Sequence, residues 1–254
     1  MQKLEHKDLL DAGVHFGHLT RKWNPAMAPY IFMEKNGIHI IDLHKTLGCI
    51  DEATEALKSV VRSGRKVMFV ATKKQAKEVV ETAAQKLNMP YVTERWLGGM
   101  LTNFATIRKS LKKMQGMEKL MKEEAYLNLA KRERLMITRE RDKLEKVLGG
   151  IADLNRLPAA LFVVDIKREH IAIAEAQKLN IPVFGIVDTN SDPNKIDYPI
   201  PGNDDAFKSI QLLTSYIGGA LEEALSERKK DKEEQAQAEE VAAKKAADKE
   251  VSEK

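Results

Sequence analysis

The sequence predicts an α/β protein with a doubly wound, five-stranded parallel sheet and a protruding antiparallel α-helical coiled-coil arm. Two short apolar runs, residues 159–165 and 181–188, each end in an aspartate, and residues 168–180 between them have helical spacing. Because these runs are apolar on both faces, they indicate parallel strands covered by helices on both sides. The third observation is a charged segment of about sixty residues before residue 159. It is too long for an ordinary crossover between strands and predicts the arm.

The other elements alternate between strand and helix along the chain. The expected strands are residues 38–43, 67–71, 91–92, 159–165 and 181–188. The expected helices of the sheet domain are residues 7–12, 45–62, 74–87, 168–180 and 207–225. Gly64 would end the second of these helices, and Asp204 and Asp205 stand where they would cap the last one. Five parallel strands that alternate with helices form a doubly wound sheet.

The arm is expected to consist of two helices that turn near residues 123–130. Its apolar residues recur near heptad spacing in two groups, which are Phe104, Ile107, Leu111, Met114 and Met121, and then Ile137, Leu144, Leu148 and Ile151. About twenty residues per helix would give an arm of about 30 Å. From Ala105 to Leu148 there are 13 Lys and Arg against 7 Asp and Glu, a net charge of +6. This excess favours an RNA partner, although a coiled coil in a neutral role would also carry exposed charges.

Composition limits the class of protein. With 254 residues and 43% hydrophobic side chains, the chain can build one large or two small folded domains. No apolar run approaches the roughly 18 residues needed to cross a bilayer, and the first seven residues lack the apolar centre of a secretory signal. A cytoplasmic protein without a membrane partner is therefore expected. Cys49 is the only cysteine, which excludes an internal disulfide and a thiolate zinc cluster.

The net charge of +4 is divided unevenly along the chain. Residues 222–254 hold 11 acidic and 8 basic residues, a net charge of −3, which leaves +7 on residues 1–221. The tail from residue 226 consists mainly of Glu, Lys, Ala and Gln and has almost nothing to bury, so we expect it to be disordered or a frayed helix. The predicted division is residues 1–103 and 152–225 for the sheet domain, 104–151 for the arm and 226–254 for the tail.

Known catalytic and nucleotide-binding motifs are missing from the sequence. Residues 71–75, the turn after the second predicted strand, contain no glycine, and neither G-x-G-x-x-G nor G-x-x-x-x-G-K-[ST] occurs in the chain. No H-E-x-x-H occurs, and no serine or cysteine nucleophile beside a histidine is evident. Basic residues without such motifs predict a contact surface rather than an enzyme site.

The amino-terminal loop, residues 14–25, is polar, aromatic and basic at once. Arg21 and Lys22 offer phosphate pairing and Trp23 offers a face for stacking, which are the features of an RNA-contacting loop. The alternative is an ordinary surface loop whose Trp23 packs on the body of the protein. Composition does not decide between the two.

Several aspartates fall near the carboxyl ends of the predicted strands. Asp188, Asp204 and Asp205 would converge on a divalent cation, zinc or magnesium, and His18 would join them if the amino-terminal loop folds over that edge. Such an ion would hold the loop on the sheet. Two alternatives remain open: the aspartates cap helices and turns, or they form the site of a metal-assisted enzyme.

Seven blocks of the sequence carry a resemblance to a known family. They are GVHFGH (13–18), Arg21 with WNP (23–25), IHIIDL (38–43), RWLGGMLTN (95–103), LFVVD (161–165), HIA (170–172) and IPVFGIVDTNSDP (181–193). The blocks closely resemble those of the bacterial small-subunit ribosomal protein two family and occur in its order. The resemblance implies a flavodoxin-like sheet with a coiled-coil arm and a structural, non-catalytic role that requires no cofactor.

The resemblance also implies partners and contact residues. The family is cytoplasmic and ribosome-bound, sits between head and body of the small subunit, and binds its ribosomal RNA. It helps to dock the messenger-binding ribosomal protein one, which supports translation initiation, and no homo-oligomer is expected. The RNA contacts expected in this sequence are Arg21, Lys22, Trp23, Asn24, Lys73, Lys74, Arg95, Trp96, Asn103, Arg108, Lys112 and Lys113.

Overall fold

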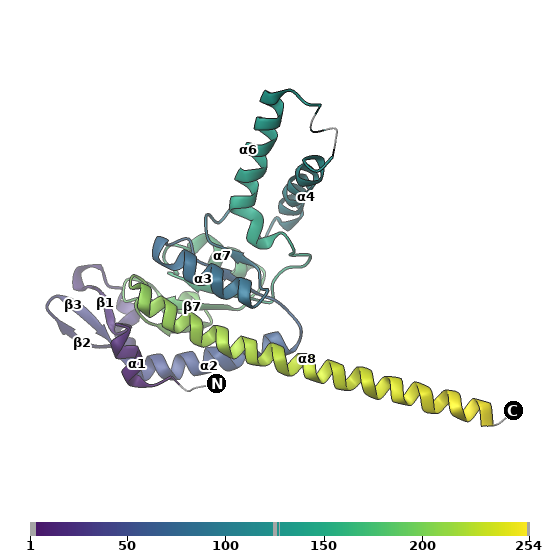
Figure 1. The fold of residues 1–254 in the computed structure, drawn as a ribbon. Coiled ribbons are helices and arrows are strands. Elements are labelled where there is room, and N and C mark those ends of the chain that lie inside the picture. The colour runs from purple at the N-terminus through teal and green to yellow at the C-terminus, as the bar shows by residue number, and fades with distance from the viewer. Residues whose placement is uncertain (1–3, 124–125, 127, 253–254) are drawn as a thin grey trace.

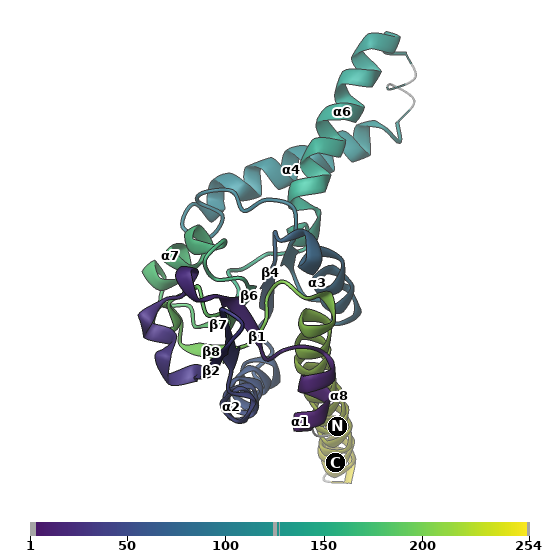
Figure 2. The ribbon, with the colours of Figure 1, turned by 90° about the vertical axis from the view of Figure 1, so that its left-hand side faces the viewer.

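The structure is a computed structural model that describes residues 4–123, 126 and 128–252, with the side chains of these residues up to 231. Its strands form two sheets (Figures 1 and 2). The five-stranded sheet is parallel throughout, in the order β5 (Tyr91–Val92), β4 (Val67–Val70), β6 (Ala160–Val164), β7 (Val183–Val187) and β8 (Tyr198–Pro201). The three-stranded sheet is antiparallel, in the order β1 (Phe16–Leu19), β3 (Ile38–Ile41) and β2 (Ile31–Lys35).

The order of the parallel strands defines the fold class. Numbered along the chain, the strands lie in the order 2-1-3-4-5, which is that of a flavodoxin-like doubly wound sheet. The predicted α/β class with five parallel strands is therefore confirmed. The order reverses between β4 and β6, and the crevice at the carboxyl ends of such a pair is where doubly wound sheets bind ligands.

The central strands are buried on both faces and so contribute to two hydrophobic cores. Phe69 of β4 packs into the core under helices α2 (Leu43–Arg62), α3 (Lys74–Lys86) and α8 (Phe207–Ser252). Its neighbours Met68 and Val70 belong to the opposite core, under α7 (His170–Lys178) and the base of the arm. This alternation follows from the two-residue repeat of a strand, and it explains why these runs are apolar throughout.

Helix α8 extends well beyond its predicted end at residue 225. Its first part buries Ile210, Leu213, Ile217 and Leu221, whose three- and four-residue spacing places them on one face of the helix. The helix then continues without interruption and points away from the body (Figure 1). The tail, for which the sequence predicts disorder or a frayed helix, is thus helical as far as Ser252. Its main residues, Ala, Glu, Lys and Gln, all have high helix propensity, which accounts for this continuation.

Two strands differ from the prediction. Residues 38–43 are predicted as the first parallel strand, but β3 pairs antiparallel with β1 and β2 and lies in the smaller sheet. Its sequence pattern identifies a strand without specifying which sheet the strand joins. The fifth parallel strand is instead β8, which is not predicted. Pro199 and Pro201 argue against an interior strand, and they are tolerated because β8 lies at the edge of the sheet.

The segment predicted as the arm forms helices α4 (Phe104–Leu120) and α6 (Lys131–Leu148), which rise out of the body side by side (Figures 1 and 2). Lys113 of α4 forms an ion pair with Glu140 of α6. The predicted turn at 123–130 falls between the helices, although residues 124, 125 and 127 lie outside the described residues. Coiled-coil packing of the two helices stays a prediction.

Short helices connect these elements. They are α1 (His6–Asp11), η1 (Thr20–Lys22), η2 (Pro25–Tyr30), η3 (Gly149–Ile151) and η4 (Pro193–Lys195). The amino-terminal loop, residues 14–25, contains β1 and η1 and ends where η2 begins, and η4 follows β7. The loop and η4 lie close together, and hydrogen bonds to Thr189 hold the loop beside the end of β7.

Candidate cation site and RNA-contacting surface

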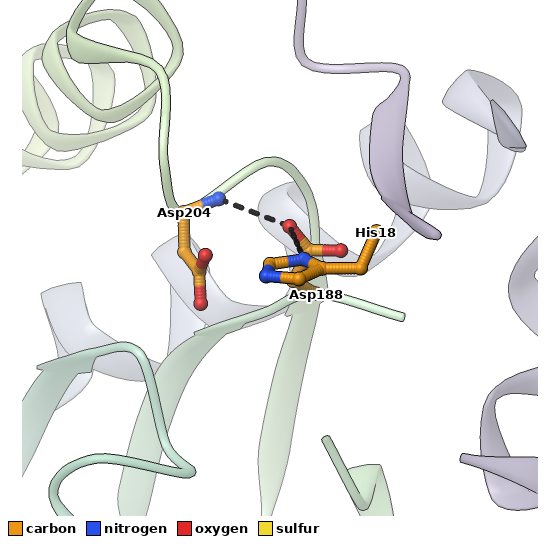
Figure 3. Close-up of side chains that lie close together, drawn as sticks. All are labelled: His18, Asp188 and Asp204. Atoms are coloured by element: carbon orange, nitrogen blue, oxygen red, sulfur yellow. Dashed lines mark hydrogen bonds and ion pairs between the residues drawn. The ribbon is translucent and has the colours of Figure 1, made fainter. Parts of the chain in front are cut away.

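A histidine and two aspartates from separate segments meet at the carboxyl edge of the parallel sheet (Figure 3). His18 comes from β1, Asp188 directly follows β7, and Asp204 lies just before α8. One nitrogen of His18 and one oxygen of each carboxylate lie within 4.8 Å of one another. The structure therefore brings together the side chains that the sequence predicts at this edge. The ion itself stays a prediction.

Thr189 anchors β1 beside the end of β7. Its Oγ1 accepts a hydrogen bond from His18 N at 2.8 Å, and its carbonyl oxygen accepts one from Asn24 N at 2.8 Å. Gly17 packs against the same side chain. A Cβ at residue 17 would lie 2.6 Å from Thr189 Cγ2 and 3.0 Å from His39 O, so only glycine lets β1 approach this closely. The close approach places His18 over the sheet edge.

We expect Gly17→Ala to lower the free energy of unfolding by about 1–3 kcal/mol, because the added methyl group must push β1 away from Thr189. Thermal unfolding measures this loss. Gly48→Ala is the matched control, since a Cβ at that position of α2 meets nothing within 4 Å. The control should be neutral or up to about 1 kcal/mol more stable, as alanine is the better helix former. Equal losses in both variants would contradict the expectation.

His18 is held by a carboxylate on each side of its ring. Its Nδ1 lies 3.0 Å from Asp188 Oδ2, and its Nε2 lies 3.3 Å from Asp205 Oδ2. The hydrogen bond with Asp188 raises the pKa of His18. Asp188 is 1% exposed and is also bonded by the backbone N–H of Thr189, so its carboxylate is fixed in place. The imidazole is therefore fixed between two carboxylates, and it would have to lose its proton to bind a cation through one of its nitrogens.

Asp204 is the buried centre of the cluster. Its Oδ1 lies 2.7 Å from Lys73 Nζ, whereas its Oδ2 has no hydrogen-bond partner in the described part of the chain. Burial, with the charges of Asp188 and Asp165, raises the pKa of Asp204 to about 7. A cation at Oδ2 would provide the missing partner and favour the ionised carboxylate.

The donor atoms of this cluster fit a divalent cation. An imidazole nitrogen with carboxylate oxygens is a ligand set of zinc, and carboxylate oxygens also suit magnesium. Asp205, the fourth predicted ligand, lies at the rim of the cluster with a side chain that is 53% exposed. It pairs with Lys73 Nζ at 2.6 Å. Burial acts to raise the pKa of Asp205, but the bond to Lys73 together with the positive charges of Lys73, His18 and Lys22 leaves this pKa lowered. Asp205 would therefore close the site from the solvent side.

The crevice between β4 and β6 is filled by a carboxylate of the protein itself. Glu169 accepts hydrogen bonds from the backbone N–H of Thr72, at 2.9 Å, and from its hydroxyl group. Arg168 Nε donates to the same hydroxyl oxygen at 2.8 Å. The backbone N–H that could bind a phosphate at this position is thus already bonded to Glu169, whose pKa is raised by burial. This arrangement agrees with the absence of a phosphate loop from the sequence.

Most of the predicted RNA contacts lie on the surface. The exposed ones are Arg21, Lys22, Trp23, Lys74, Arg95, Asn103, Arg108, Lys112 and Lys113, and Asn24 is half-buried. Two others point inward. Lys73 is 11% exposed and lies within ion-pairing distance of Asp165, Asp204 and Asp205. Trp96 is 7% exposed and packs in a hydrophobic core, so we leave both out of the RNA-contacting surface.

Glu175 of α7 organises the loop at the base of the arm, although no motif in the sequence points to it. Its buried carboxylate accepts hydrogen bonds from Trp96 Nε1 at 3.1 Å, Gly99 N at 2.7 Å and Leu101 N at 2.9 Å. The backbone N–H and hydroxyl of Thr102 donate to it at 3.0 and 3.1 Å. These partners lie 73 to 79 positions earlier in the chain, so no local sequence signal could have revealed them.

Comparison with known proteins identifies the family. The model of the family described as ribosomal protein S2 matches residues 9–224. The chain belongs to this family. It is 72% identical over 248 residues to the small ribosomal subunit protein uS2 of Cytophaga hutchinsonii, with 98% of each chain covered. Identity to the protein of the same name from Flavobacterium johnsoniae is 63% over 241 residues, or 95% of each chain. For that of Parabacteroides distasonis it is 62% over 232 residues, or 91% of this chain and 84% of the relative.

Membership of the ribosomal protein S2 family confirms the resemblance found in the sequence. It also confirms that the protein is a structural protein of the ribosome and not an enzyme. The family match covers the sheet domain and the arm and ends before the charged tail. Within the described ranges, the structure contains no helix long and apolar enough to cross a membrane.

Proposed function

We propose that the protein is a ribosome-bound structural constituent of the small subunit that binds small-subunit ribosomal RNA between head and body. The observation that carries this proposal is the exposed basic and aromatic surface defined above. Lys and Arg side chains on such a surface pair with phosphates, and they position the protein on RNA without reading its sequence. Family membership supports the same role, because the relatives are named as proteins of the small subunit.

The surface has two parts that would contact RNA at separate points. The amino-terminal loop contributes Arg21, Lys22 and Trp23, and the arm contributes Arg108, Lys112 and Lys113. Because the arm projects from the body, it can reach RNA that the sheet domain does not contact (Figure 2). Its helices have a narrow buried seam, and the net charge of +6 from Ala105 to Leu148 would favour the bound state.

We also propose a structural divalent cation, zinc or magnesium, at His18, Asp188 and Asp204, with Asp205 at the rim. The buried Oδ2 of Asp204, which has no hydrogen-bond partner among the residues that the structure describes, supports it. An ion there would join β1 to the loops after β7 and β8 and so hold the RNA-contacting loop in place. The role is structural, and no reaction is attributed to it.

A protein partner is proposed in addition to RNA. Following the family resemblance, the chain would help to dock the messenger-binding ribosomal protein one and so support translation initiation. The smaller sheet exposes large apolar side chains, with Phe16, Phe32 and Met33 at 48%, 70% and 46% exposure. Apolar patches of this kind are suited to a protein neighbour rather than to RNA phosphates.

Sedimentation tests the proposed function. In a sucrose gradient of gently lysed cells, we expect the tagged protein to move with the small subunit at low salt and to be released as salt rises, because phosphate contacts are weakened by salt.

Removing two cations from α4, as in Arg108→Ala with Lys112→Ala, should reduce the slope of log affinity against log salt by about 1.5 to 2.

The matched control replaces Lys229 and Lys230 with alanine. These exposed lysines of α8 lie outside the proposed surface, so the slope should not change. If the wild-type protein stayed at the top of the gradient under all salt conditions, placement in the small subunit would be wrong. The content of ribosomal protein one in the same fractions measures docking, and Phe32→Ser should reduce it without releasing the protein from the subunit.

A further inference from the structure

A cavity of about 560 Å³ lies beside the carboxyl ends of β6 and β7 and is not used by the cation cluster. One wall is the amino-terminal loop with Lys22, Trp23 and Asn24, and the others are α7 with the residues just before it and the segment around η4. Ligand pockets of proteins typically measure 300–1,000 Å³, so the cavity is large enough for one nucleotide. It lies near the edge of the sheet where doubly wound proteins place their ligands.

The side chains that line the cavity carry an excess of positive charge. Lys22, Lys167 and Lys195 all line it, and the only carboxylate among the lining residues is that of Asp192. In the described part of the chain, none of the three ammonium groups forms an ion pair or a hydrogen bond with the protein. Asp192, in contrast, is engaged as the cap of η4, where it accepts a hydrogen bond from Asn194 N at 3.1 Å. Three unpaired cations around one cavity suit an anionic ligand.

An aromatic ring and amide groups complete the lining. Trp23 is 40% exposed, and its ring packs against that of His39 with a centroid distance of 5.1 Å. The indole is thus supported by the protein while part of it faces solvent and is free to stack on a base. Asn24 and Asn190 place amides at the same cavity, and amides can bond the edge of a base.

The walls of the cavity are held together by hydrogen bonds between distant segments. Asn24 N donates to Thr189 O at 2.8 Å, which fixes the Trp23 side of the cavity to the loop after β7. Gln177 Nε2 of α7 donates to Lys195 O at 2.8 Å, which fixes α7 to η4. The cavity is therefore formed before any ligand arrives.

We propose that this cavity binds a single nucleotide of ribosomal RNA whose base is unstacked from its strand, with the base against Trp23 and its phosphates near Lys22, Lys167 and Lys195. The proposal rests on the RNA-binding function proposed above and adds to it a defined site. It also assigns RNA contacts to Lys167 and Lys195, which lie more than 140 residues from the amino-terminal loop in sequence. Single-stranded or extruded bases are the form of RNA that aromatic side chains recognise by stacking.

The test uses small subunits isolated from cells that carry the full-length protein. The variant is Lys167→Ala with Lys195→Ala, and the control is Lys178→Ala, an exposed lysine at the end of α7 that does not line the cavity. Dimethyl sulfate probing reads the accessibility of adenine and cytosine bases along the RNA, and kethoxal and carbodiimide probing read that of guanine and uracil bases. In parallel, the tryptophan fluorescence of the purified protein is followed during titration with each nucleoside monophosphate and with short single-stranded RNA, and the signal of Trp23 is the difference from Trp23→Ala, in which only Trp96 remains.

We expect the double variant to remain in the subunit, with a salt slope lower by about 1.5 to 2. One base or two adjacent bases should gain reactivity in this variant and not in the control. Trp23→Ala should expose the same bases and weaken binding of short RNA about tenfold or more. Identical reactivity in the double variant and the wild type, in subunits that contain equal amounts of the protein, would overturn the proposal.

Two further outcomes separate the sources of failure. Quenching of Trp23 by a free nucleoside monophosphate, with no change in RNA reactivity in any variant, would overturn RNA as the source of the nucleotide. Failure of the wild-type protein to sediment with the small subunit would overturn the proposed function, and with it the inference that depends on it.

Discussion

Glu175→Ala is expected to lower the free energy of unfolding by about 3–5 kcal/mol and to release the loop at the base of the arm. The carboxylate of Glu175 accepts hydrogen bonds from the side chain of Trp96, from the backbone of Gly99 and Leu101, and from Thr102. Trp96 and Leu101 are buried, so their donors would be left without a partner. An unsatisfied buried donor costs about 1–3 kcal/mol, and bonds to a charged acceptor are the stronger class.

The protonation state of Glu175 gives this prediction a pH signature. Burial acts to raise the pKa of Glu175, but the hydrogen bonds to Thr102, Trp96 and the neighbouring backbone outweigh it and leave the pKa lowered. A lowered pKa in the folded state means that the carboxylate stabilises the fold above the pKa of the unfolded chain, near 4.3, and that this contribution is lost as pH falls through the folded pKa. Glu175→Ala should therefore be less sensitive to acid in this range than the wild type.

Chemical denaturation at pH 7 and at pH 3 measures both effects. Glu175→Gln keeps the shape but replaces one acceptor with a donor, so it should also destabilise the protein, by about 2 kcal/mol or more. Lys178→Ala on the same helix is exposed and should change stability by less than about 0.5 kcal/mol. If the free energy of unfolding of Glu175→Ala at pH 7 equalled that of the wild type, the hydrogen bonds at the base of the arm would contribute little to stability.

The sequence predicts four strands of the parallel sheet, β4 to β7, but it misses the edge strand β8 and assigns β3 to the wrong sheet. Strands β4, β6 and β7 are predicted because burial on both faces leaves a continuous apolar run, which few other structures share. β8 is not predicted because it contains Pro199 and Pro201, which only an edge strand tolerates. β3 is assigned to the wrong sheet because the sequence of a short alternating strand does not show which strands it pairs with. Sheet membership depends on pairing between distant residues, which a local pattern does not contain.

In the candidate site, too, some features can be predicted from the local sequence and others depend on residues far away in the chain. Aspartates after parallel strands must share one edge, so the meeting of Asp188 with Asp204 follows from the fold class. Lys73 is predicted to contact RNA as part of a basic turn, but the structure directs it into this acidic cluster. Its burial depends on Asp165 and Asp204, which lie about 90 and 130 residues away in the sequence. The sequence of the turn alone therefore does not show that Lys73 is surrounded by negative charge.

Removal of a divalent cation from the cluster should destabilise the protein. A ligand present at a hundred times its dissociation constant stabilises the folded state by about 2.7 kcal/mol. For a domain of this size the melting temperature would then fall by about 5–10 °C when a strong chelator is added. Asp188→Asn and Asp204→Asn should abolish this difference, whereas Asp153→Asn, an exposed carboxylate outside the cluster, should preserve it. Elemental analysis of the protein purified without chelator identifies the ion.

The behaviour of the chelated protein distinguishes a cation site from a set of capping aspartates. Burial and the neighbouring carboxylates Asp188 and Asp165 raise the pKa of Asp204 to about 7 from 3.8, so in the absence of an ion stability falls as pH rises from about 4 through 7. The raised pKa of His18 acts in the same direction. With a cation bound, the negative charge is compensated and this loss should disappear, because the ion favours the ionised carboxylate.

Whether Asp204→Asn stabilises or destabilises the protein depends on whether a cation is bound. If a cation occupies the cluster at neutral pH, Asp204→Asn removes a ligand and must destabilise the protein. If no cation binds, the same substitution removes a buried charge that is repelled by Asp188, and it should leave stability unchanged or increase it. Thermal unfolding of Asp204→Asn at pH 8, with and without chelator, therefore decides between the two, and a stabilised variant in both conditions would exclude the proposed ion.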